Sequence, residues 1–189
     1  DIVNTLRFED LQDVVLVGHS YGGMVITGVA DRAPERLARL VYFDAAYPGP
    51  GQNATGGFAQ GTGDVLDELA GGAGDDSWKL PPLPLAAYGV TEPDDVAWIG
   101  DRRVPHAMPT LQEALRPART EPPAVPRVYV RCLRREGLVT VFGVDPLQPM
   151  FDRAVADGLT IATIDAGHDA MVTAPDQVAR ALLTAAGHV

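Results

Sequence analysis

Lysine is nearly absent from the chain. Of the 15 lysines and arginines, only Lys79 is a lysine. The acidic residues number 25 and the formal net charge is -10, and an acidic surface of this kind repels nucleic acid and anionic lipid. No apolar run approaches the roughly 18 residues that a transmembrane helix needs. We therefore expect neither nucleic acid nor a membrane as a partner. The oligomeric state stays open.

Cysteine and serine are scarce as well. Cys132 is the only cysteine, so an internal disulfide is excluded, and its apolar neighbours predict a small core residue. An unpaired thiol fits a reducing compartment, and we expect a cytoplasmic location. Serine occurs twice, at Ser20 and Ser77, which makes the setting of each one informative.

Apolar residues are plentiful, at 46% of the 189 residues, and their pattern predicts an α/β fold. Residues 14–17 form a β-branched run without alternation, typical of a strand that is buried on both faces of a parallel sheet. A helical stretch follows at 24–33, and 40–43 reads as a second buried strand. Strand, helix and strand within about thirty residues indicate a right-handed βαβ unit.

The composition changes after this unit. Nine glycines lie between residues 49 and 74 and ten prolines between 81 and 126, with short helical patterns at 65–70, 94–100 and 110–116 and no convincing strand. Large apolar residues, among them Trp78, Tyr88, Trp98 and Met108, argue against a disordered linker. We expect an insertion of loops and short helices.

The core pattern resumes with strands at 127–132 and 159–164 and helices at 148–157 and 175–186. The sequence thus predicts a mostly parallel sheet flanked by helices. The predicted division is a first core part at 1–46, the insertion at 47–124, and a second core part at 125–189.

A G-x-S-x-G motif, 18–22, lies between the first strand and the first helix, as a nucleophile elbow requires. The sharp turn holds Ser20 in a strained conformation with its hydroxyl exposed, and we expect glycine at Gly18 and Gly22 because side chains there would collide. The backbone N–H of Tyr21 is placed to stabilise an oxyanion.

A serine nucleophile needs a base, and His168 is the best candidate among the histidines. It follows the strand at 159–164 in a short loop, which puts it at the same carboxyl edge of the sheet as Ser20. His19 lies inside the turn, and its side chain should point away from the Ser20 hydroxyl. His106 lies in the insertion, and a structural role is favoured for it.

Three segments, 18–24, 40–45 and 167–171, resemble the α/β-hydrolase superfamily. They look most like its small serine esterase branch, which includes plant methyl-ester esterases, hydroxynitrile lyases and bacterial relatives. The resemblance covers roughly half of the chain. It implies a Ser–acid–His triad, no metal and no cofactor. It also implies a helical cap inserted into the core, and the insertion at 47–124 lies where that cap belongs. The family fold normally has several strands before the nucleophile, so we also expect that an N-terminal portion is missing.

The acid of the triad stays open between two residues. In much of the family it follows the strand that here is 127–132, where this chain has arginines and then Glu136. Asp44 ends the buried strand after the nucleophile helix, and some branches of the superfamily place their acid there. A carboxylate at that edge needs a partner to stay ionised, and an imidazole N–H supplies one, which favours Asp44.

These observations predict a carboxylesterase that cleaves small apolar esters through an acyl-enzyme. The expected pocket residues are His19, Trp78, Trp98 and Met108. The alternatives are a degenerate, ligand-binding hydrolase fold, which the atypical acid and the missing strands favour, and a lyase that uses the same triad. The single lysine, Lys79, lies in the cap and makes the lyase the weaker alternative.

Overall fold

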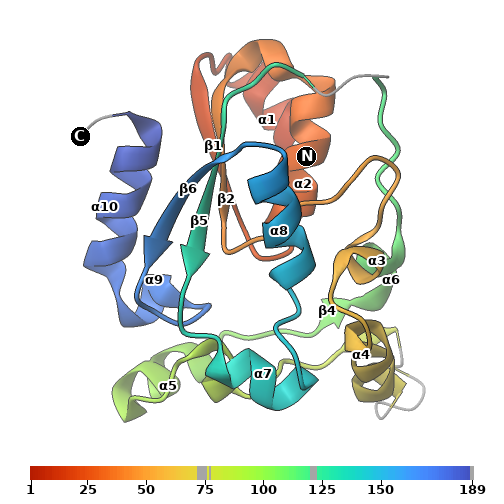
Figure 1. The fold of residues 1–189 in the computed structure, drawn as a ribbon, viewed down its shortest axis with the longest axis vertical. Helices are drawn as coiled ribbons and strands as arrows, with labels where there is room; N and C mark the ends of the chain where they lie inside the picture. Colours follow the sequence, from red (N-terminus) through yellow and green to blue (C-terminus); the bar gives the residue numbers. More distant parts are fainter. Residues whose placement is uncertain (72–75, 77, 120–122, 188–189) are drawn as a thin grey trace.

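The computed structural model describes residues 1–71, 76, 78–119 and 123–187 (Figure 1). Its centre is a four-stranded parallel sheet with the strand order β1-β2-β5-β6. These strands are β1 (Val14–His19), β2 (Leu37–Phe43), β5 (Arg127–Cys132) and β6 (Thr160–Ile164). The predicted α/β class with a parallel sheet is confirmed.

Helices cover both faces of this sheet. One of them precedes β1, and the others follow the carboxyl ends of the strands. The core helices are α1 (Ile2–Phe8), α2 (Gly22–Arg32), the 3-10 turn η1 (Pro34–Arg36), α7 (Glu136–Phe142), α8 (Gln148–Ala156), α9 (Ala170–Thr173) and α10 (Pro175–Ala186).

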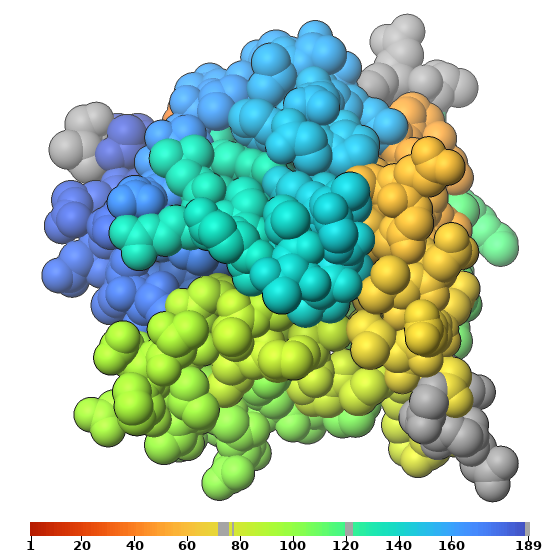
Figure 2. All heavy atoms as spheres, turned by 60° about the horizontal axis from the view of Figure 1, so that its bottom comes forward, coloured from red at the N-terminus to blue at the C-terminus, as the bar shows by residue number. Residues whose placement is uncertain are grey.

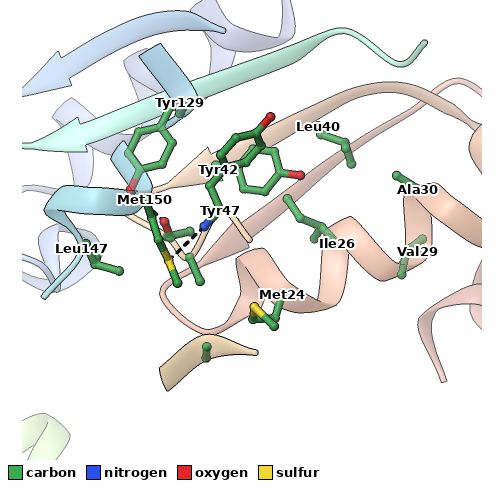
Figure 3. Close-up of a cluster of buried hydrophobic side chains, with 14 of the residues drawn as sticks. Met24, Ile26, Val29, Ala30, Leu40, Tyr42, Tyr47, Tyr129, Leu147 and Met150 are labelled. Carbon is green, nitrogen blue, oxygen red and sulfur yellow. Dashed lines mark hydrogen bonds between the residues drawn. The ribbon is translucent and has the colours of Figure 1, made fainter. Parts of the chain in front are cut away.

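Alternating side chains of the central strands feed two hydrophobic clusters. Leu40, Tyr42 and Tyr129 face α2 and α8, where Met24 and Met150 pack against them (Figure 3). The residues between them on the same strands, among them Val41, Phe43 and Val130, face α9 and α10. Because both faces of these strands are apolar, residues 40–43 of β2 and 128–130 of β5 form continuous apolar runs.

Strand β1 departs from the expectation of burial on both faces. It forms one edge of the sheet and pairs with β2 alone, and Val17 is 40% exposed. In β2, by contrast, Leu40 to Phe43 are all at most 2% exposed. An apolar run therefore identified both strands, but it could not tell an edge position from a central one.

The elements between β2 and β5 gather at the carboxyl end of the sheet (Figure 1). They are α3 (Ala54–Gly57), α4 (Thr62–Gly71), β3 (Lys79–Leu80), the 3-10 turn η3 (Leu85–Tyr88), α5 (Pro93–Gly100), β4 (His106–Ala107) and α6 (Met108–Gln112). The expectation of no strand here is wrong, because β3 and β4 form a short antiparallel pair. The third predicted helix is displaced toward the N-terminus, from 110–116 to α6.

Helix α7 was not predicted, and it joins the insertion to the second core part. Figure 2 shows the insertion, in yellow and green, packed beside the teal segment that includes α7. The proposed boundaries at residues 46 and 124 stay a prediction, since α7 lies beyond the second boundary and still contacts η3. Within the ranges given above, every helix is too short or too polar to cross a membrane.

Candidate active site

Three loops that follow parallel strands meet at one edge of the sheet. Ser20 follows β1, Asp44 follows β2, and His168 lies in the loop after β6. Because carboxyl ends of parallel strands share an edge, residues 148 positions apart in the sequence come together here. This is the edge that the insertion and α7 cover.

Ser20 occupies the sharp turn between β1 and α2. Its φ of 53° is in the left-handed region, which a residue with a side chain adopts only under constraint. Its carbonyl accepts the N–H of Gly23 at 3.1 Å and of Ala46 at 2.9 Å. These bonds tie the turn to the end of β2 and hold the strained conformation.

Two glycines around Ser20 allow backbone segments to approach each other closely, but only one of them is at an expected position. A Cβ at Gly18 would lie 2.5 Å from the carbonyl oxygen of Gly22, as expected. At Gly22 a Cβ would meet nothing within 4 Å, so the expected collision there is wrong. The second crowded position is Gly23, where a Cβ would lie 1.9 Å from the Ala46 carbonyl oxygen.

His168 and Asp44 form a buried pair. His168 Nδ1 lies 2.6 Å from Asp44 Oδ2, and the two residues are 4% and 0% exposed. A carboxylate beside Nδ1 fixes the tautomer with the proton on Nδ1 and leaves the Nε2 lone pair free. Glu136, the other candidate acid, is exposed at the start of α7 and lies outside this pair.

Two arginines also bind Asp44, and one of them, Arg135, shares Oδ2 with His168. Arg135 Nη1 donates to Oδ2 at 2.5 Å, Arg131 Nη1 lies 3.8 Å from Oδ1, and the Cys132 N–H donates to Oδ1 at 3.2 Å. Both arginines pair in turn with Asp145. Burial alone would raise the pKa of Asp44, but His168 and the two guanidinium groups outweigh burial and hold that pKa well below its usual range.

The sequence shows arginines near the expected acid position, but no role was predicted for them. Arg131 carried a usable signal, because it is a charged residue within the apolar strand β5 and is only 5% exposed. A buried cation of this kind requires a nearby anion. That requirement points to Asp44 and Asp145.

His19 packs against the loop that carries His168. Its Nε2 lies 3.0 Å from the His168 carbonyl oxygen, and the two rings are 4.5 Å apart. Burial, followed by the nearby His168, lowers the pKa of His19 to about 4. His19 is therefore neutral at physiological pH, and a neutral imidazole donates to the carbonyl without placing a second positive charge beside His168.

Donor atoms of His19, His168 and Asp169 lie within 4.8 Å of one another, which is the spacing of a metal site. However, His168 Nδ1 is committed to Asp44 and His19 Nε2 to a backbone carbonyl. Each histidine keeps one nitrogen for other partners. The expectation of a metal-free site stays a prediction.

Ser20 and His168 open into a pocket of about 180 Å³. Its walls are largely apolar, and they come from α3, α4, α6, α7 and the segments next to them. The lining residues besides these two are Tyr21, Phe58, Thr62, Leu66, Leu80, Leu83, Tyr88, His106, Leu111, Leu138, Phe142, Pro146 and Leu147.

The pocket residues expected from the sequence lie elsewhere. Trp78 and Trp98 are surface residues, 52% and 56% exposed, each with a basic side chain over its ring. Met108 is 3% exposed and belongs to the hydrophobic core, and His19 lies under the His168 loop. Trp78, Trp98 and Met108 are large and apolar, but neither property indicates which way a side chain points.

His106 lines the pocket, and the structural role expected for it stays a prediction. Its Nε2 lies 2.7 Å from Thr110 Oγ1, and its ring meets the Tyr21 ring edge-on at 5.0 Å. Burial lowers its pKa. The Tyr21 hydroxyl donates to the Thr110 carbonyl at 3.2 Å, so Tyr21 and His106 together fix one wall.

Tyr21 is also the N-cap of α2. Backbone N–H groups at the start of a helix have no intrahelical partner, and they carry the positive end of the helix dipole. Next to Ser20, such a group suits a developing negative charge. The Ser20 Oγ–His168 Nε2 hydrogen bond is not among the contacts of the described residues, and such bonds often tighten only when substrate binds.

Comparisons with known proteins show the family of the chain. A model described as the alpha/beta hydrolase family matches residues 1–181. A carbendazim hydrolyzing esterase from Nocardioides sp. (strain SG-4G) is 33% identical over 201 residues, which cover 96% of this chain and 75% of that protein.

Two solved structures share the fold. An extracellular alpha/beta-hydrolase from a Paenibacillus species superimposes with a TM-score of 0.77 and 21% identity, covering 97% of this chain and 76% of that one. Tomato Methylketone Synthase I in complex with 2-tridecanone superimposes with a TM-score of 0.66 and 18% identity, covering 98% and 74%.

Proposed function

Because the chain belongs to the alpha/beta hydrolase family, we propose that it is a serine carboxylesterase in which Ser20, His168 and Asp44 form the catalytic triad. The observation that carries the proposal is the buried His168–Asp44 pair, 2.6 Å apart, in the pocket that Ser20 also lines. The esterase relative at 33% identity supports the reaction class.

Each residue has a distinct part in the reaction. His168 Nε2 takes the proton of Ser20 Oγ as this oxygen attacks the ester carbonyl carbon, and the Tyr21 N–H stabilises the resulting oxyanion. The bond to the alcohol breaks as His168 returns the proton to the leaving oxygen. Water then hydrolyses the acyl-serine, with His168 acting as the base again.

The substrate class follows from the pocket. A volume of about 180 Å³ with mostly leucine and phenylalanine walls fits a short apolar group rather than a long chain. We therefore propose small apolar esters as substrates.

The assignment of the acid is tested by kinetics on 4-nitrophenyl esters from acetate to octanoate. We expect kcat/KM to be highest for the short chains. Asp44→Asn should lower kcat by about 10³–10⁴-fold, because the histidine loses the carboxylate that sets its tautomer. Glu136→Gln is the matched control and should stay near the wild-type rate, since Glu136 is exposed.

Two results would contradict the proposal. The first is a folded wild-type protein that turns over no ester of the series, which favours the ligand-binding alternative. The second is a large loss in Glu136→Gln with little loss in Asp44→Asn, which would move the acid to α7.

A further inference from the structure

One polar side chain in the catalytic pocket is buried without a partner. Thr62, the first residue of α4, lines the pocket and is 1% exposed. Among the described residues, its Oγ1 has no hydrogen-bond partner. The hydroxyl is thus removed from solvent and left unpaired.

Such a group is unusual in this protein. The hydroxyls of Thr27 and Thr140 donate to helix carbonyls at 2.7 and 2.8 Å, and that of Thr110 donates to the Ala107 carbonyl at 2.8 Å. A buried hydroxyl with no partner destabilises the folded state, and in native proteins each such group calls for an explanation, which can be a bound water or ion or a functional role. A valine of nearly equal shape would avoid that penalty at Thr62.

The walls around this hydroxyl leave a bound ligand as its natural partner. Phe58, Leu66 and Leu147 line the same pocket as Thr62, and their side chains offer no polar atom. The same lining also has polar side chains, at Ser20, Tyr21, Tyr88, His106 and His168. Since Thr110 Oγ1 donates to Ala107, it accepts from His106 Nε2, which leaves His106 Nδ1 with a lone pair.

We propose that Thr62 determines substrate specificity by hydrogen-bonding a polar atom within an otherwise apolar substrate group. This inference rests on the proposed function, because it concerns the substrate of the same site. The substrate class narrows accordingly. The esters that bind best carry an ether oxygen, carbonyl or ring nitrogen in the part that enters the pocket, and purely alkyl esters bind less well.

Two pairs of esters with matched shape test the proposal. Phenyl methoxyacetate and phenyl butyrate differ by one oxygen in place of a methylene in the acyl group, and 2-methoxyethyl benzoate and butyl benzoate differ in the same way in the alcohol. Their affinities are measured by NMR titration with the Ser20→Ala protein, which cannot consume them. We expect the preference for the oxygen-containing member of at least one pair to fall about fivefold when Thr62→Val is added, which corresponds to one net hydrogen bond between neutral groups.

Thr140→Val in the same Ser20→Ala protein is the matched control. Thr140 is an exposed threonine on α7, and its substitution should leave both affinity ratios unchanged. Thermal melting gives a second readout: Thr62→Val should keep or raise Tm, because it removes an unpaired hydroxyl.

The inference is overturned if Thr62→Val leaves both ratios unchanged, and a fall in Tm with unchanged ratios would assign the hydroxyl a structural role instead. These outcomes are separate from the failure of the proposed function. That failure appears as an absence of turnover in the wild-type protein, whereas the titrations require no catalysis.

Discussion

Asp44 shows how single residues in this site are balanced by charge. The buried carboxylate of Asp44 and the partly buried carboxylate of Asp145 face the guanidinium groups of Arg131 and Arg135, so the four charges cancel. The arginines keep Asp44 ionised even when His168 is neutral. A neutral His168 with its proton on Nδ1 is the form that a general base requires.

His19 gives a prediction on the pH dependence of stability. Its pKa falls from 6.5 to about 4 on folding, so the unfolded chain binds the proton more readily. The stability that His19 contributes is therefore present above pH 6.5 and is lost as the pH falls toward 4, by roughly 3 kcal/mol in total. His19→Gln, which keeps a donor for the His168 carbonyl, should flatten this part of the curve of unfolding free energy against pH.

Urea unfolding at several pH values between 4 and 7 measures the effect. His106→Gln serves as the comparison, because His106 is also shifted downward by burial but is less buried, so a smaller change is expected. An equal slope in the wild type and in His19→Gln would contradict the burial of a neutral imidazole under the His168 loop.

At the scale of elements, the seam between α7 and η3 connects the insertion to the core. Gly137, the second residue of α7, makes the close approach possible: a Cβ there would lie 2.3 Å from the Ala86 carbonyl oxygen and 2.7 Å from that of Ala87. Since α7 also contributes Leu138 and Phe142 to the pocket, this seam positions one wall of the site.

Substitution of Gly137 tests the seam. Alanine normally stabilises a helix relative to glycine by about 1 kcal/mol, but the collision with backbone should outweigh this gain and destabilise the protein by about 1–3 kcal/mol. Gly137→Ala should therefore lower Tm by several degrees. Gly63→Ala is the matched control, at the second position of α4, where a Cβ meets nothing within 4 Å. A Tm for Gly137→Ala at or above that of Gly63→Ala would show that the seam is not tightly packed.

The elements also show what the sequence could predict. The buried strands, the turn at Ser20 and the helix that follows carry local signals, namely continuous apolar runs and glycines at fixed spacing, and the structure contains all of them. The short strands β3 and β4 carry no such signal, since each has two residues and depends on its partner across 26 positions. Helix α7 was missed for a similar reason, because its packing against η3 rather than its own pattern stabilises it.

For the whole molecule, the sequence predicted which residues meet at the edge of the sheet but not which residues line the pocket. Strand topology alone indicated that Ser20, Asp44 and His168 share one edge, because parallel strands end on the same side. The pocket required the three-dimensional paths of α3, α4, α6 and α7, which come from both sides of β5. Trp78 and Trp98 were therefore misplaced, and Thr62 and His106 were not assigned to the pocket.

The central claim is that the His168–Asp44 pair activates Ser20. The most direct test is the rate at which a fluorophosphonate probe labels the folded protein, with the modified residue located by peptide mass mapping. We predict labelling at Ser20 in the wild type, none in Ser20→Ala, and labelling at least about 100-fold slower in His168→Gln, since an unassisted serine hydroxyl is a weak nucleophile. A folded wild-type protein that is not labelled at Ser20, or that is labelled equally fast without His168, would contradict the claim.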